Sequence, residues 1–107
     1  MSTMTVLGEV VEERIRQDEK WGVQDYPMGT GDRPGLSLAE AVAHADEMRR
    51  TCDEAFTLGV GTWLHILDEE VAEASAESDP EKLRAELLQV AAVAVAMVEA
   101  LDRRGAR

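Results

Sequence analysis

The order of apolar and polar residues along the chain predicts four helices and no strand. Apolar residues recur every three or four positions in four stretches, at about residues 4–20, 37–57, 62–78 and 80–103. Two of these stretches open with capping residues: Ser37 followed by Glu40, and Asp79 followed by Pro80. Glycines and prolines separate the stretches, and the longest break, residues 23–35, is expected to be a loop. The pattern therefore predicts an all-α fold.

The last of these helices is apolar around its whole circumference. From Leu87 to Val98 every residue except Gln89 is apolar. A helix that is apolar on all sides is normally buried on all sides, and a small monomer rarely encloses one helix completely. We therefore expect a four-helix bundle completed by homo-oligomerisation, as a homodimer or tetramer, with residues among Val90 to Leu101 in the interface.

Length, composition and charge narrow the class of protein. The 107 residues predict a single domain over 1–107, and 45% apolar with 4% aromatic residues indicates an aliphatic core of packed helices. The net charge of −11 argues against a duplex nucleic acid partner, which requires a basic surface. No apolar run is long enough to span a membrane, and the single Cys52 cannot form an internal disulfide. We therefore expect a cytoplasmic protein.

Acidic residues form two short faces on the last two predicted helices. Glu69, Glu70 and Glu73 lie on one helix, and Glu86 and Gln89 follow after a gap of twelve residues. Residues three or four apart share a helix face, so Glu70 and Glu73 point the same way, as do Glu86 and Gln89. Two oxygen-rich faces on consecutive helices suit a hard divalent cation, whereas the simplest alternative is a solvated acidic surface.

The position of Glu86 favours the cation site. Glu86 shares its face with Leu83 and Val90, at the head of an apolar stripe, where an unpaired charge is costly. Its partner is either a basic side chain, such as Arg14 or Arg84, or a cation that it shares with the acids of the preceding helix. Gln89, the one polar residue of its apolar stretch, is expected to be buried with hydrogen-bond partners.

These residues resemble a known signature. The pattern EE-x-x-E, a gap, and E-x-x-D marks the MazG-like all-α nucleoside triphosphate pyrophosphohydrolases, and the run from Arg16 to Gly22 is similar to a segment of one MazG-like subgroup. The resemblance implies a MazG-like bundle that hydrolyses a nucleoside triphosphate, or a related nucleotide, between the α and β phosphates. The products are a monophosphate and pyrophosphate, and the cofactor is Mg²⁺ or Mn²⁺.

Carried over by position, the resemblance also implies site residues. Glu70, Glu73 and Glu86 are the expected metal ligands, with Gln89 as a further, uncharged one. Glu69 and Glu70 are the expected catalytic residues, and Glu69 is either another ligand or the group that orients and deprotonates the attacking water. Gln89 departs from the pattern, which has Asp there. This favours a second interpretation, a catalytically reduced MazG-like module that binds nucleotide or a protein partner.

The first helix offers candidates for substrate binding. Gln17 and Trp21 lie on one face of it, and Lys20 lies near its end. Trp21 either stacks on a base or packs as an anchor, and Lys20 either reaches a phosphate or neutralises the helix C-terminus.

Four further residues have ordinary structural explanations. We expect His44, His65 and Cys52 to be structural. Arg49 either contacts a phosphate from a neighbouring subunit or pairs with surface acids such as Asp46, and we favour the pairing.

Overall fold

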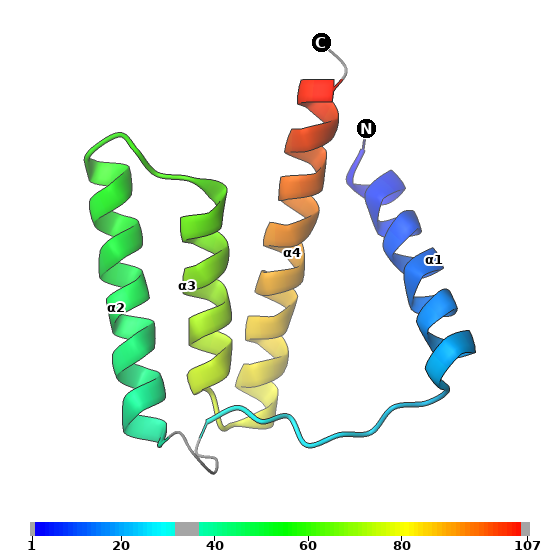
Figure 1. Ribbon diagram of the computed structural model, residues 1–107, viewed down its shortest axis with the longest axis horizontal. Coiled ribbons are helices and arrows are strands. Elements are labelled where there is room, and N and C mark those ends of the chain that lie inside the picture. Colours follow the sequence, from blue (N-terminus) through cyan, green and yellow to red (C-terminus); the bar gives the residue numbers. More distant parts are fainter. Residues whose placement is uncertain (1, 32–36, 106–107) are drawn as a thin grey trace. The chain divides into compact units, whose positions relative to one another are not determined.

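The computed structural model describes residues 2–31 and 37–105, and within these ranges the chain is all-α without strands. Figure 1 shows the helices, α1 (Thr3–Trp21), α2 (Leu38–Thr57), α3 (Trp63–Ala76) and α4 (Pro80–Gly105). The four predicted helices are confirmed to within a few residues at each end. Residues 32–36, in the second half of the predicted loop, lie outside the described residues.

Side-chain caps explain where α2 and α4 begin. The Ser37 hydroxyl accepts the backbone N–H of Glu40 at 3.2 Å, and Asp79 Oδ2 accepts that of Lys82 at 3.0 Å. α3 ends at Ala76, earlier than predicted, because Asp79 must leave the helical conformation to cap α4. α4 includes Gly105, which the sequence pattern places beyond its end.

A capping box begins α3. Thr62 Oγ1 accepts the N–H of His65 at 3.3 Å, and His65 Nδ1 accepts the N–H of Thr62 at 3.0 Å. Two backbone donors that the helix leaves unpaired are thereby satisfied. His65 therefore has the structural role expected of it.

The chain divides into two compact units, Met1–Met28 with Ala94–Arg107, and Gly29–Val93. In the first unit the Thr3 hydroxyl donates to Glu99 Oε1 at 2.6 Å, and Val6 and Ala100 are buried. The second unit contains α2, α3 and the first half of α4. The acidic residues singled out above all lie in this second unit.

In the second unit α2 and α3 run antiparallel and pack side by side (Figure 1). Their buried residues are small, and one larger side chain comes from α4: Ala41, Ala45, Cys52, Ala55, Ala72, Ala74 and Leu83. Small side chains allow helix axes to approach closely. The acidic side chains of α3 are therefore held near both neighbouring helices.

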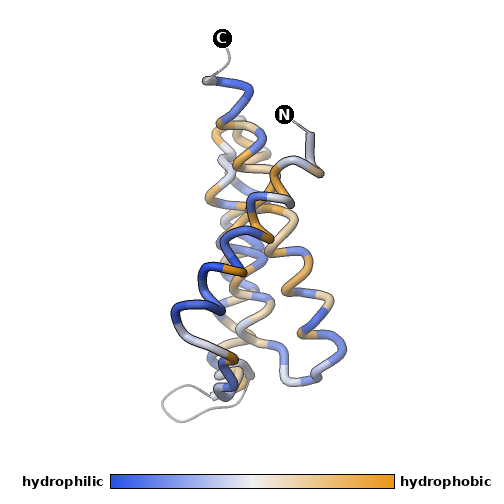
Figure 2. Tube along the Cα trace, turned by 90° about the vertical axis from the view of Figure 1, so that its right-hand side faces the viewer, coloured by the Kyte–Doolittle hydropathy of each residue, from blue (hydrophilic) through white to orange (hydrophobic). Residues whose placement is uncertain are grey.

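α4 is not enclosed within the described residues of a single chain, and its predicted burial against a second subunit stays a prediction. Figure 2 shows apolar and polar residues alternating along the helices. On α4 Leu88 is 56% exposed and Leu101 63% exposed, and Gln89 is exposed as well. The apolar circumference therefore has only part of its surface covered by the chain itself. Among the described residues no helix is both long and apolar enough to cross a membrane.

A backbone hydrogen bond of Gly31 connects the chain before α2 to the end of α3. The N–H of Gly31 donates to the Ser75 carbonyl at 2.7 Å. Gly31 has a φ of 68°, and an added Cβ would collide with the Ser78 side chain.

We expect Gly31→Ala to lower the free energy of unfolding by about 2–3 kcal/mol, from left-handed strain and collision together. Gly29→Ala is the control, since Gly29 has φ of 73° but an added Cβ there meets nothing within 4 Å. Equal losses in urea denaturation would contradict the proposed collision.

Candidate metal centre

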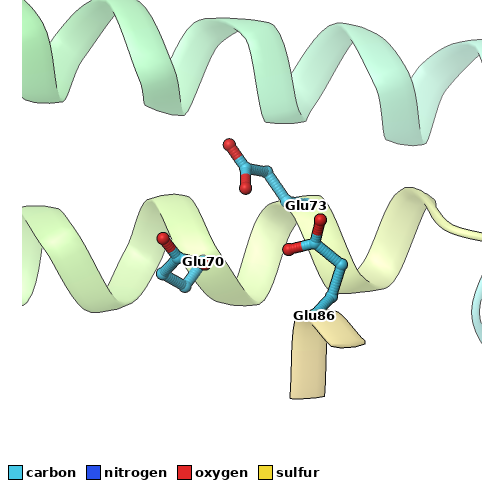
Figure 3. A group of neighbouring side chains, drawn as sticks. All are labelled: Glu70, Glu73 and Glu86. Atoms are coloured by element: carbon cyan, nitrogen blue, oxygen red, sulfur yellow. The ribbon is translucent and has the colours of Figure 1, made fainter. Parts of the chain in front are cut away.

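Three carboxylates converge between α3 and α4. Glu70 and Glu73, one helical turn apart on α3, and Glu86, in the second turn of α4, each place an oxygen within 4.8 Å of the others. Figure 3 shows these three side chains, with the Glu73 carboxylate extending toward α2. The structure thus brings together the three residues expected to be metal ligands. Oxygen ligands at such spacing suit a hard divalent cation.

Two of these oxygens are buried without a hydrogen-bond partner among the described residues. They are Oε2 of Glu70 and Oε2 of Glu86, on side chains that are themselves only partly exposed. A buried carboxylate oxygen without a partner loses its hydration and gains nothing in return. A cation held between the two helices would supply the missing interaction. The donor set therefore fits Mg²⁺ or Mn²⁺.

Burial and mutual repulsion both favour protonation of this cluster. Burial is the main cause that raises the pKa of Glu70, followed by the charges of Glu73, Glu86 and Glu69. Burial also raises the pKa of Glu86, followed by the charges of Glu73 and Glu77 and a hydrogen bond with Glu73, while Arg49 acts in the opposite direction. The cluster thus retains protons more readily than separate carboxylates do.

Arg49 of α2 brings a positive charge next to the acidic cluster. Its guanidinium lies 3.2 Å from Glu73 Oε1, 3.8 Å from Glu69 Oε1 and 3.3 Å from Asp46 Oδ1. The pairing with Asp46 agrees with the sequence interpretation, but the contacts with α3 were not anticipated. Arg14, considered as a partner for Glu86, instead pairs with Asp18 on its own helix at 2.8 Å.

Glu69 lies beside the converging acids and faces α2. It is not one of the three that jointly offer metal-binding oxygens, and its neighbours are Arg49 and Cys52. Burial, followed by a hydrogen bond with Glu69, raises the pKa of the Cys52 thiol to about 11. Cys52 is therefore a protonated, buried thiol with low reactivity, in agreement with the expected structural role.

Gln89 differs from its sequence interpretation. It lies one turn after Glu86 on α4, but its side chain is exposed and not buried. Neighbouring Leu87 and Leu88 are exposed as well, so the chain itself does not bury this part of α4, and burial of the Gln89 amide stays a prediction for the proposed oligomer.

An open groove of about 270 Å³ adjoins the acids. α2, α3 and the start of α4 line it with Val42, Ala45, Asp46, Arg49, Glu73, Ala76, Glu77 and Glu86. A ligand in this groove would lie against Glu73 and Glu86. Within it the acidic side chains outnumber the basic ones.

The candidate substrate-binding residues lie together in the first unit. Gln17, Lys20 and Trp21 line one open depression of about 330 Å³ at the end of α1. Trp21 is 62% exposed in the single chain, and Lys20 Nζ lies 4.9 Å from the centre of its ring. This distance is typical of a cation–π contact. One face of the ring is therefore already used by Lys20.

Comparison with known protein families, curated proteins and solved structures finds no match to this chain.

The raised pKa values predict how stability changes with pH. Above the ordinary carboxyl pKa of 4.5, Glu70 and Glu86 bind more protons in the folded than in the unfolded chain. Their contribution to the free energy of unfolding therefore falls as pH rises from 4.5 through their folded-state pKa values. We expect Glu70→Gln to gain stability relative to the wild type across this window, in urea denaturation at a series of pH values.

The exposed Glu54 provides the control for this effect. Glu54→Gln leaves the cluster intact and should keep the fall in stability that the cluster causes as pH rises. The free energy of unfolding of Glu70→Gln could instead change with pH in parallel with that of the wild type. That result would show that charge repulsion within the cluster does not lower stability.

Proposed function

We propose that this protein is a Mg²⁺- or Mn²⁺-dependent nucleotide pyrophosphohydrolase that cleaves a nucleoside triphosphate, or a related nucleotide, between the α and β phosphates. The observation that supports it most is the convergence of Glu70, Glu73 and Glu86 with two buried oxygens that lack partners. The resemblance of these residues to the MazG-like signature supplies the choice of reaction.

In this proposal the three converging acids hold the cation on the groove side of α3. The cation would neutralise phosphate charge and ease deprotonation of the attacking water. Glu69, beside the cluster, orients the water and accepts its proton, and Glu70 supports it from the same helix. Hydrolysis leaves a nucleoside monophosphate and pyrophosphate.

A substrate-binding role is proposed separately for three residues of the first unit. Gln17 offers an amide for hydrogen bonding, Lys20 a positive charge, and Trp21 an exposed aromatic ring. Stacking of a base on Trp21 adds favourable contact that does not depend on the identity of the base. These three residues form the proposed substrate-binding set.

Gln89 favours a second function. An uncharged side chain stands where the family pattern has a carboxylate, so the cluster has one negative charge fewer. A weaker cation site would still bind a nucleotide without hydrolysing it efficiently. The alternative is thus a catalytically reduced module that binds nucleotide or a protein partner.

We also propose that the active protein is a homodimer or tetramer. Exposed apolar side chains occur on α4, including Leu87, Leu88, Val98 and Leu101, and on α1, including Val10, Val11 and Ile15. Apolar surface of this extent is normally covered by a partner. A second copy of the chain would bury the apolar circumference of α4.

The reaction is tested with a panel of canonical and modified nucleoside triphosphates, with Mg²⁺ or Mn²⁺ and detection of pyrophosphate. We expect at least one substrate to be hydrolysed, and Glu73→Gln to lower kcat/KM by roughly a hundredfold or more, because it removes a charged metal ligand. Glu47→Gln, at an exposed position of α2, is the control and should keep wild-type activity. Nucleotide binding without pyrophosphate release would support the reduced module instead.

The assembly is tested by light scattering coupled to size-exclusion chromatography at micromolar concentration. We expect a mass of two or four times the 11.7 kDa chain. Leu101→Glu should shift the mass toward a single chain, since a charge in an apolar interface is costly. A wild-type protein that elutes with the mass of one chain would refute the proposed oligomer.

A further inference from the structure

The charged side chains that line the groove beside the acids are mostly acidic, which is unfavourable for a phosphate ligand. Its charged side chains are Asp46, Glu73, Glu77, Glu86 and Arg49, so among the described residues that line it four are acidic and one is basic. A polyphosphate entering this groove is repelled by the carboxylates unless cations intervene. Among the described residues that line the groove, Arg49 is the one with a positive charge to attract phosphate.

Arg49 contacts a carboxylate that also belongs to the candidate metal site. Its Nη2 donates to Glu73 Oε1 at 3.2 Å, and Glu73 is also one of the three acids with converging oxygens. A divalent cation at the cluster and the guanidinium therefore draw on the same carboxylate. Once a cation binds Glu73, less negative charge remains there for Arg49.

Arg49 does not lose its position when that contact weakens. Its Nη1 donates to Asp46 on its own helix, and its Nε lies 3.8 Å from Glu69 Oε1. These contacts keep the guanidinium at the rim of the groove, where its side chain is 50% exposed. Once the contact with Glu73 is lost, the N–H groups of the planar guanidinium are free to donate hydrogen bonds to phosphate oxygens.

We propose that Arg49 is a phosphate-binding residue of this site, which holds Glu73 in the metal-free chain and donates to a phosphate oxygen of the ligand once a divalent cation has taken Glu73. This inference rests on the metal site of the proposed function and adds to it the residue that recognises the polyphosphate. It assigns Arg49 a contact within its own chain, whereas the sequence favoured a surface pair.

The inference predicts two effects of opposite sign from one substitution. Arg49→Gln removes a competitor for Glu73, so Mn²⁺ alone should bind about twofold to fivefold more tightly, the range of an exposed ion pair. The same variant lacks the charged donor, so inorganic pyrophosphate in saturating Mn²⁺ should bind roughly tenfold or more weakly. An ion pair with a purely structural role does not produce this combination.

The experiment is calorimetric titration of the intact protein, first with Mn²⁺ and then with pyrophosphate at saturating Mn²⁺. Arg50→Gln is the matched control, because Arg50 is the next residue on α2, is exposed, and forms no ion pair with another described residue. We expect both of its affinities to stay within about twofold of wild type, as for an ordinary surface change.

The possible outcomes separate this inference from the proposed function. If the wild type binds no Mn²⁺, the metal site and the role of Arg49 both fail. If the wild type binds Mn²⁺ and pyrophosphate, but Arg49→Gln leaves the pyrophosphate affinity unchanged, the role of Arg49 alone is overturned. Weaker Mn²⁺ binding by Arg49→Gln would also overturn it, since Arg49 would then support Glu73 rather than compete for it.

A second variant covers the case in which Arg49→Gln does not fold. Arg49→Lys keeps the positive charge but has no planar fork for two parallel hydrogen bonds. Arg49→Lys should bind pyrophosphate more weakly than the wild type does. It should bind pyrophosphate more tightly than a folded variant in which residue 49 is uncharged. Pyrophosphate affinity equal to wild type in Arg49→Lys would contradict recognition by the guanidinium.

Discussion

The carboxylates of Glu70, Glu73 and Glu86 converge to within 4.8 Å, so their repulsion must be offset by protons, by Arg49 or by a bound cation. The structure bears on each of these solutions differently. Burial and neighbouring charges raise the pKa of Glu70 and Glu86, and the guanidinium of Arg49 contacts Glu73. A divalent cation is the solution that also reaches the two buried oxygens without partners.

The small core of the second unit makes this convergence possible. Ala72 and Ala74 are buried on α3, and Ala45 and Cys52 are buried on α2. With no bulky side chain at these positions the helices lie close together, and glutamates of α3 can reach both neighbours. The cap at Asp79 ends α3 early and fixes the start of α4, which sets the position of Glu86 seven residues later.

Sequence reasoning recovered the features that depend on spacing along one helix. The helix boundaries follow caps and periodicity, and the pairing of Glu70 with Glu73 follows from the helical turn. The contacts of Arg49 with Glu69 and Glu73 were missed because the register between α2 and α3 is set by packing, which no local pattern encodes. Gln89 is exposed in the single chain, since an apolar stretch indicates what a helix can bury and not what covers it.

Binding of one divalent cation by these three acids can be tested by anomalous diffraction from crystals grown with Mn²⁺. We expect an anomalous peak within bonding distance, about 2.0–2.6 Å for hard cations, of oxygens from Glu70, Glu73 and Glu86. The same map would show whether Nη2 of Arg49 has left Glu73. An intact Arg49–Glu73 contact with no anomalous peak at millimolar Mn²⁺ would show that the acids do not bind the cation.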